Sequence, residues 1–292
     1  MHGHDSTSAH PSVPSPSLTT DVLEAIKAMR KAAPLVQCLT NAVVSNITAN
    51  ALLAAGAAPA MCDTPDESFD FAQLASGVLI NGGTPNPEQY EGMRQAIAGA
   101  RQAGTPWVLD PVAAGALTTR TNFYREVLPL SPAVIRGNAS EIGVLGGASA
   151  GGRGVDATDR PEDVLAPARH LSSSTGATVA ISGATDYVVT GERITAVKGG
   201  HPTMAQVIGT GCFLGALVAA YAGAAKAQGL DLHAAVVAAH AHTKAAGVVA
   251  GQLHPTRPGS FAVAWLDALA ELTPEQILEL VTLHPAGKDG QA

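Results

Sequence analysis

A short turn of small residues, Gly209-Thr210-Gly211, comes directly before Cys212 and a long apolar run that is typical of a helix. The first turn of a helix has backbone N–H groups without partners in the helix, and glycine lets a ligand approach the backbone closely. The turn is therefore a candidate cradle for an oxyanion or a transferring phosphoryl group. A turn that serves packing alone is the alternative.

Cys212 stands where the positive end of the helix dipole favours a thiolate. We expect its pKa to lie below the usual value of about 8.5, so that it can act as a base or as a nucleophile. The structural alternative is a small buried hydrophobe, which is the common role of a free cysteine. Its position directly after the glycine turn favours the chemical role.

The stretch "RGNASEI" places Arg136, Asn138 and Glu141 close together after an apolar run. Arg136 can pair with phosphate oxygens through its planar fork. Glu141, together with Asp110 of "LDPVAAG", can hold Mg²⁺ through water, because this ion favours oxygen ligands and keeps much of its hydration. Helix capping and surface solvation are the structural alternatives for the two carboxylates.

Several other catalytic patterns are absent from the sequence. There is no GxxxxGK[ST] motif, which excludes a Walker-type loop. His240 and His242 are two residues apart on an expected helix, so they do not share a face and do not fit a zinc pair. The turn and the strand-end residues remain as the candidates.

The composition argues against some partners and favours one compartment. The formal net charge is −7 and the Lys and Arg residues do not cluster, so we expect no nucleic-acid binding. The most hydrophobic stretch, residues 212–225, is too short to span a bilayer, so we expect no membrane association. The three cysteines show no metal-type spacing and fit a reducing compartment, which predicts a cytoplasmic protein.

The chain of 292 residues is expected to fold as one domain with a tail. Residues 1–18 are rich in Ser, Pro and His and lack the continuous apolar core of a signal peptide, so we expect a disordered tail. Residues 19–292 contain no repeat and no linker that indicates a second domain. We therefore assign them to a single domain.

Helix-like and strand-like segments alternate from Asp21 onward, which is typical of an α/β fold. Two short β-rich runs joined at Gly191 and Glu192 predict an antiparallel hairpin at one edge of the sheet, and the remaining C-terminal part reads as helical. We predict a mostly parallel central sheet with helices on both faces and this edge hairpin. The strands of the parallel part are expected at residues 34–40, 77–82, 106–112, 133–138 and 178–183.

Ligands of such a sheet collect at the carboxyl ends of its strands. The polar residues after the expected strand cores are therefore the informative ones. They are Asn41, Asn81, Asp110, Arg136, Asn138, Glu141 and Ser182.

With these residues in place, the sequence resembles the hydroxyethylthiazole kinases of the ribokinase-like superfamily from about Asp21 to Leu283. The stretch "CLTNAVVSNITANALLAAGAAPAM" is similar to that family's "ITNxVVxNxTANxLLAxGASPxM". "VLDPVAAGA", "IRGNASEI", "GTGC" and "RPGSF" match further blocks in the same order. Several linked blocks are far more specific than any single motif.

The resemblance implies transfer of the ATP γ-phosphate to 4-methyl-5-(2-hydroxyethyl)thiazole, a salvage step toward thiamine, with Mg²⁺ required. It implies a homotrimer with sites between neighbouring subunits. Cys212 takes the position of the base. The implied thiazole contacts are Asn41, Val43, Met61, Gly209 and Gly211; the ATP contacts are Arg136, Ser182 and Asn138; and the magnesium-supporting carboxylates are Asp110 and Glu141.

The sequence departs from the family pattern at four places. "INGGT" stands where "NIGT" is common, Ala114 where "DPVGAG" has glycine, and Ser182 and Ile208 where threonine is usual. We expect these changes to affect substrate affinity more than reaction type. Three readings stay open beside the thiazole kinase: a kinase of another heterocyclic alcohol of the pyrimidine type, a nucleotide-dependent dehydratase of hydrated nicotinamide cofactor, and a non-catalytic sensor.

Overall fold

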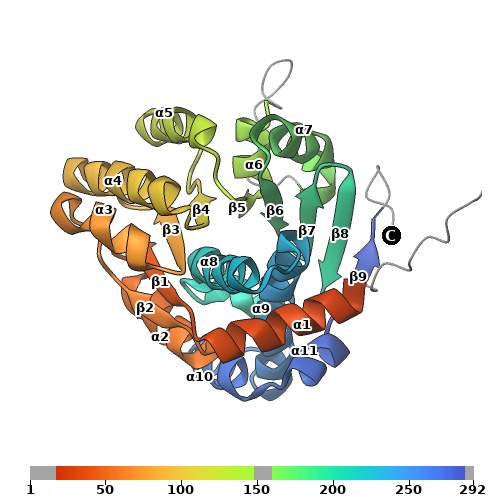
Figure 1. Cartoon of the computed structure of the whole chain (residues 1–292). Helices are drawn as coiled ribbons and strands as arrows, with labels where there is room; N and C mark the ends of the chain where they lie inside the picture. The colour runs from red at the N-terminus through yellow and green to blue at the C-terminus, as the bar shows by residue number, and fades with distance from the viewer. Residues whose placement is uncertain (1–17, 148–159, 287–292) are drawn as a thin grey trace, which may run out of the picture.

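The computed structural model describes residues 18–147 and 160–286, which form a nine-stranded sheet with helices on both faces (Figure 1). The strand order is β2-β1-β3-β4-β5-β6-β7-β8-β9, parallel as far as β6 and antiparallel beyond it. The predicted fold is confirmed. The strands are β1 (Leu35–Leu39), β2 (Ala58–Ala60), β3 (Gly77–Asn81), β4 (Trp107–Asp110), β5 (Val134–Asn138), β6 (Thr178–Ser182), β7 (Thr185–Thr190), β8 (Arg193–Lys198) and β9 (Thr282–Pro285).

The parallel strands are continuous apolar runs because helices cover both of their faces. One hydrophobic cluster lies between the sheet and the helices α1, α2, α8, α9, α10 and α11, and a second lies between the sheet and α3 to α7 (Figure 1). The hairpin of β7 and β8 turns at Gly191 and Glu192 as predicted. Two strands that the sequence did not indicate, β2 and β9, extend the two edges.

Local signals fix several helix ends. Asn86 accepts a hydrogen bond from the backbone N–H of Gln89 at the start of α4, and Gly104 ends that helix in the left-handed region at φ 70°. The predicted tail, residues 1–18, lies outside the described residues except for Leu18, which begins α1. The helices are α1 (Leu18–Ala32), α2 (Ser45–Ala55), α3 (Pro65–Leu74), α4 (Pro87–Ala103), α5 (Thr118–Val127), α6 (Ala139–Leu145), α7 (Leu165–Thr175), α8 (Thr210–Gln228), α9 (Leu232–Leu253), α10 (Pro258–Glu271) and α11 (Pro274–Leu280), with short 3₁₀ turns at Leu128–Leu130, Pro161–Val164 and Pro202–Gln206.

Helix α8 lies directly on the sheet because small residues let the two backbones approach. A Cβ on Gly77 of β3 would come within 2.3 Å of the carbonyl oxygen of Ala219. By length and hydropathy α8 is able to cross a membrane, but 72% of that window is buried inside the protein, as in the core helix of a globular domain. This contact places the start of α8 above the carboxyl ends of the central strands.

Candidate active site

Five polar side chains form a continuous line of hydrogen bonds across the carboxyl ends of β1, β3, β4, β5 and β6, which are neighbours in the sheet. Asn41 donates to Asn81 Oδ1 at 3.0 Å, and Asn81 donates to Asp110 Oδ2 at 2.9 Å. Arg136 pairs with Asp110 at 3.4 Å and donates to Ser182 Oγ at 2.7 and 3.1 Å. We call these five residues the strand-end network. All of them were named from the sequence because each follows a strand core.

Cys212 joins the strand-end network from α8, since Asn41 Nδ2 lies 3.5 Å from its Sγ. The sulfur is partly exposed, so it is not simply part of the core. The expectation of a lowered pKa is wrong. Burial of the thiol, followed by the negative charge of Asp110, raises the pKa of Cys212, and the opposing effects of the asparagine amides and Arg136 are smaller.

The turn before Cys212 has the geometry that its glycines predict. Gly209 lies in the left-handed region at φ 93°, and its carbonyl accepts the first helical hydrogen bond, from Phe213 N, at 2.8 Å. Gly211 lies beside the Arg136 guanidinium: a Cβ on Gly211 would stand 3.8 Å from Arg136 Nη2. The free N–H groups at the start of α8 and the Arg136 cation thus lie together, which suits a multiply charged anion.

We expect Gly209→Ala to damage both stability and activity. An L-residue at this φ costs about 1–2 kcal/mol, and the added methyl would stand 2.4 Å from Ile47 Cγ2, an overpacking cost of about 1–3 kcal/mol. Gly229→Ala is the matched control, because Gly229 has φ 66° and open space around it, so only the backbone cost applies. Urea unfolding of both variants measures the difference. Equal losses in the two variants would contradict the packing argument.

Glu141 and Asn138 form a capping box at the start of α6. The Asn138 side chain accepts from Glu141 N, and Glu141 Oε2 accepts from Asn138 N at 2.8 Å. Glu141 Oε1 also accepts from Ala113 N at 3.0 Å. The capping alternative raised for Glu141 is therefore observed. Burial raises the pKa of Asp110, and the charge of the capping Glu141 carboxylate adds to this rise.

The loop after β4 corrects one expectation. Ala114, named as the departure from "DPVGAG", is buried in the second hydrophobic cluster, and the first glycine of that motif aligns with Ala113. The residue in the left-handed region is its neighbour Ala113, at φ 62°. Because this region favours glycine, the departure that matters for the backbone is at Ala113.

We expect Ala113→Gly to stabilise the protein. Removing the side chain relieves a cost of about 1–2 kcal/mol, and the greater chain entropy of glycine in the unfolded state offsets about 0.5–1 kcal/mol of this gain. The free energy of unfolding should therefore rise, by up to about 1.5 kcal/mol. Thermal unfolding measures this. Ala114→Gly is the control and should lower stability, since Ala114 is buried and its backbone is not left-handed. A loss of stability in both variants would refute the strain.

A cavity of about 600 Å³ opens on one side of the glycine turn, and we call it the Arg136 cavity. Arg136, Ser182 and Gly211 line it, together with Lys244 and the segment from Gly199 to Pro202. Asn41, Met61 and Cys212 do not line it. The predicted ATP contacts Arg136 and Ser182 therefore share one cavity. Of the predicted thiazole contacts, Gly211 also lines it, whereas Asn41, Val43, Met61 and Gly209 do not.

The remaining predicted thiazole residues lie around the edge next to β1. Val43 follows Asn41 in the loop before α2 and is more than half exposed. Met61 is partly buried after β2, the strand beside β1. The structure thus places Val43 and Met61 after the neighbouring strands β1 and β2.

Two groups that shape the site were not predicted from the sequence. Gly83 supports the network: its N–H donates to Asn81 Oδ1, and a Cβ there would stand 2.6 Å from Asn41 Nδ2. Lys244 and Asp186 form a buried ion pair at the Arg136 cavity. A local signal for Gly83 existed in the "INGGT" departure, whereas nothing in the sequence connects Lys244 with Asp186.

Comparison with known families shows which family the chain belongs to. A family model described as the hydroxyethylthiazole kinase family matches residues 26–275, a range that contains the strand-end network and Cys212. The chain belongs to the hydroxyethylthiazole kinase family. It is therefore an enzyme of a kinase family, and the resemblance stated from its motifs is confirmed.

Individual relatives agree with the family. The chain is 54% identical to hydroxyethylthiazole kinase of Corynebacterium glutamicum over 92% of its own length and 100% of that protein. The structure of a hydroxyethylthiazole kinase protein from Pyrococcus horikoshii matches with a TM-score of 0.80 and 34% identity, covering 91% of this chain and 98% of that one. A ribokinase-like superfamily protein from Enterococcus faecalis matches at a TM-score of 0.56 and 13% identity, covering 88% and 90% of the two chains, which bears on the fold alone.

Proposed function

We propose that this enzyme transfers the γ-phosphate of ATP to the hydroxyl group of 4-methyl-5-(2-hydroxyethyl)thiazole. The observation that carries the proposal is the position of the glycine turn. On one side lies the Arg136 cavity, and at its end lies Cys212, linked through Asn41 and Asn81 to Asp110. A phosphate donor and an alcohol acceptor on opposite sides of one anion-binding turn is the arrangement that phosphoryl transfer needs.

We assign the nucleotide to the Arg136 cavity. Arg136 and Ser182 would contact phosphate oxygens, and the N–H groups at the start of α8 would face the transferring group. Asn138 stands next to them at the end of β5. The thiazole alcohol would bind on the other side, near Asn41, Val43, Met61 and Gly209.

The carboxylates fit a magnesium ion that is held partly by the nucleotide. Asp110 Oδ1 is buried and has no hydrogen-bond partner among the described residues. No group of three or more His, Cys, Asp or Glu side chains suited to a metal occurs in the described part of the chain. Mg²⁺ characteristically uses one or two carboxylates plus substrate phosphates, so Asp110 with Glu141 meets its needs. Bound there, the ion would neutralise charge on the phosphates.

Cys212 would receive the proton of the acceptor hydroxyl as its oxygen attacks phosphorus. Its raised pKa has two opposite consequences: the thiolate is a stronger base, and it is scarcer at neutral pH. Asn41 donates to the sulfur and thereby stabilises the thiolate and fixes its direction. The proposed base is therefore oriented by the same network that holds Asp110.

The proposal is tested by product formation. The purified enzyme is assayed with ATP, Mg²⁺ and the thiazole alcohol, and in parallel with a pyrimidine alcohol and with hydrated nicotinamide cofactor. We expect the thiazole phosphate ester, with kcat/KM at least tenfold above that for the pyrimidine. Equal or preferred turnover of the pyrimidine alcohol, dehydration of the cofactor, or binding without turnover would each replace the proposal by one of the other readings.

The proposed assembly is a homotrimer in which a neighbouring subunit completes the thiazole side. Five large apolar side chains are more than half exposed on adjoining elements, and α10 packs against α2, α9 and the 3₁₀ turn before α8. Exposed apolar side chains gathered in this way are typical of a protein interface. We call them the apolar patch, and they are Val43, Leu53, Ile208, Leu253 and Val263.

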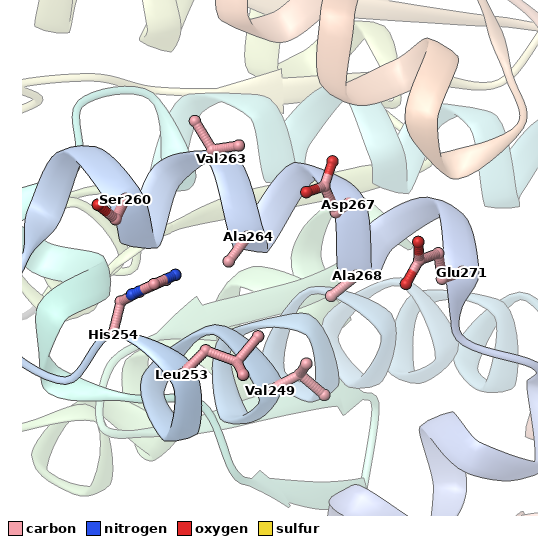
Figure 2. Close-up of a pocket in the computed structure, with 9 residues that line it drawn as sticks. All are labelled: Val249, Leu253, His254, Ser260, Val263, Ala264, Asp267, Ala268 and Glu271. Atoms are coloured by element: carbon pink, nitrogen blue, oxygen red, sulfur yellow. The ribbon is translucent and has the colours of Figure 1, made fainter.

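The apolar patch continues into a groove of about 450 Å³ between the end of α9 and α10 (Figure 2). Leu253 lies on the α9 side and Val263 on the α10 side, with Asp267 and Glu271 further along α10. Ile208, where the family has threonine, belongs to this surface. Its change therefore falls on the proposed interface and not on the backbone of the turn.

We expect Val263→Lys to lower the mass in solution from three chains of 29.4 kDa toward one, as measured by light scattering. A lysine in an apolar interface must be desolvated without a partner. Leu74→Lys is the matched control, because Leu74 is also more than half exposed but lies on α3, away from the apolar patch. A wild-type monomer, or trimers in both variants, would remove the patch from the assembly.

We further propose that the enzyme acts in the cytoplasm in thiamine salvage and binds neither nucleic acid nor membranes.

A further inference from the structure

Lys244 is a buried cation that the proposed chemistry does not use. It stands in the middle of α9, is 6% exposed and forms part of the wall of the Arg136 cavity. A lysine is almost never buried unless it is paired, because its charge must be removed from water. Its partners therefore indicate what it does.

Every N–H of the Lys244 ammonium has a partner in the turn between β6 and β7 or at the start of β7. Nζ donates to the carbonyl oxygens of Gly183 at 3.1 Å and Ala184 at 3.0 Å, and it lies 3.2 Å from Asp186 Oδ1. An ammonium has three donors, so none remains free for a ligand. Lys244 is thus placed to hold the protein backbone and not to contact the nucleotide.

Asp186 holds the same turn from the other side. Its Oδ1 accepts from Gly183 N at 2.8 Å, and its Oδ2 accepts from His240 Nδ1 at 2.8 Å. Burial alone would raise the pKa of Asp186, but Lys244 and His240 outweigh it, so the pKa lies below its usual value and the carboxylate stays charged. The peptide groups on both sides of Gly183 are therefore bound to charged side chains.

The residue before Gly183 is Ser182, the partner of Arg136. Ser182 Oγ accepts from both Nε and Nη2 of Arg136, so the plane of the guanidinium depends on where this hydroxyl stands. The contacts run without a gap from Lys244 and Asp186 through the turn to Ser182 and then Arg136. A change at Lys244 is expected to reach the phosphate-binding group without touching the thiazole side.

We propose that Lys244 and Asp186 are positioning residues for nucleotide binding, which clamp the turn at Gly183 and so fix Ser182 and the Arg136 guanidinium. This inference rests on the proposed binding of ATP in the Arg136 cavity. It assigns to two residues, 58 positions apart in the sequence, a role in affinity for the phosphate donor.

The test is a double-mutant cycle with Lys244→Met and Ser182→Ala, read in the KM for ATP. Hydrogen bonds to charged groups contribute about 1.5–3 kcal/mol, so each single change should raise this KM by about 10- to 100-fold, with the KM for the thiazole alcohol changed less than about twofold. If Lys244 acts through Ser182, the KM for ATP of the double variant should exceed that of the single variant with the higher KM by no more than about twofold. Fold-changes that multiply, or a rise of both KM values, would overturn the proposal.

Two further variants keep the test interpretable. His242→Leu is the matched control, because His242 is equally buried two residues away on α9 but contacts Tyr221 and the carbonyl of Leu269; it should lower the melting temperature and leave the KM for ATP unchanged. If Lys244→Met does not fold, Asp186→Asn removes the charge with little change in size and should raise the same KM. An unchanged KM for ATP in Asp186→Asn would overturn the clamp.

A binding measurement distinguishes a failure of the proposed function from a failure of the role proposed for Lys244. The same variants are titrated with a non-hydrolysable ATP analogue by calorimetry, without any acceptor. If the wild type binds the analogue but does not phosphorylate the thiazole alcohol, the substrate assignment fails and the cycle still tests the clamp in the dissociation constants. Equal dissociation constants for the wild type and Lys244→Met would overturn the clamp whatever the acceptor is.

Discussion

Arg136→Ala is expected to lower kcat/KM for ATP by about 10²–10³-fold, because a cation next to transferring phosphates is among the strongest contributors to this kind of catalysis. The KM for the thiazole alcohol should change less than about threefold, since Asn41, Val43, Met61 and Gly209 lie outside the Arg136 cavity. Steady-state kinetics with each substrate varied in turn measures both. Arg136→Lys is the control, because it keeps the charge but loses the two hydrogen bonds of the guanidinium to Ser182. Its kcat/KM for ATP should lie between those of the wild type and Arg136→Ala. Unchanged use of ATP in Arg136→Ala would remove this residue from the site.

Arg136→Ala should also lower the free energy of unfolding relative to the wild type, by an amount that depends on pH. Asp110 is almost fully buried, and without Arg136 its carboxylate has lost its cation, which typically costs about 3–5 kcal/mol. Burial, with a smaller contribution from Glu141, already raises the pKa of Asp110 to about 7 while Arg136 opposes the rise. A raised pKa means that the folded state binds the proton more tightly, so the variant should regain stability as pH falls from 8 to 6. A stability gap from wild type that does not narrow over this range would contradict the role of Asp110.

Cys212→Ser is expected to lower kcat by about 10²-fold, the usual contribution of a general base, with the KM for the thiazole alcohol changed less than about twofold. Serine is similar in shape and keeps a hydrogen bond with Asn41, so the loss should fall on proton transfer and not on packing. Cys62→Ser is the matched control, because Cys62 is also a partly exposed free thiol but lies after β2 and is not part of the strand-end network. Equal kcat in Cys212→Ser and wild type would mean that the turn and the metal suffice.

The pH profile of kcat shows whether Cys212 takes part in proton transfer. Burial and the charge of Asp110 raise the pKa of Cys212, so the reactive thiolate should form only on the alkaline side, and kcat of the wild type should rise from pH 7 toward pH 9. Cys212→Ser should lose this rise, because a serine hydroxyl does not ionise in that range. A rise of the same size in the variant would assign the ionisation to another group.

The strand ends explain why so much of the site was predictable. A parallel strand buried on both faces reads as an apolar run, and the first polar residue after it must stand at the carboxyl edge of the sheet. Asn41, Asn81, Asp110 and Ser182 were found in this way, and the glycine turn before Cys212 was found from the small residues that open α8. The order of the strands was not available from these signals, and it is the order that turns separate residues into the strand-end network.

Where the predictions failed, the decisive environment came from distant parts of the chain. The helix dipole acts locally and favoured a low pKa for Cys212, but burial of the thiol at the carboxyl ends of the strands and the charge of Asp110, 102 positions away, outweigh it. The departure from "DPVGAG" was assigned to Ala114, whereas the left-handed backbone of Ala113 and the hydrogen bond from its N–H to Glu141 show that Ala113 stands where the family has glycine.

The sequence by itself determined the alternation of strands and helices, the turn of small residues and the set of polar side chains at strand ends, since these depend on local conformational preference and on the period of burial. The tertiary structure decided which of these side chains meet, what charge they hold and how Lys244 and Asp186 support them. The physical reason is that pairing across a sheet and removal from water depend on residues far apart in the chain, and no local pattern records them.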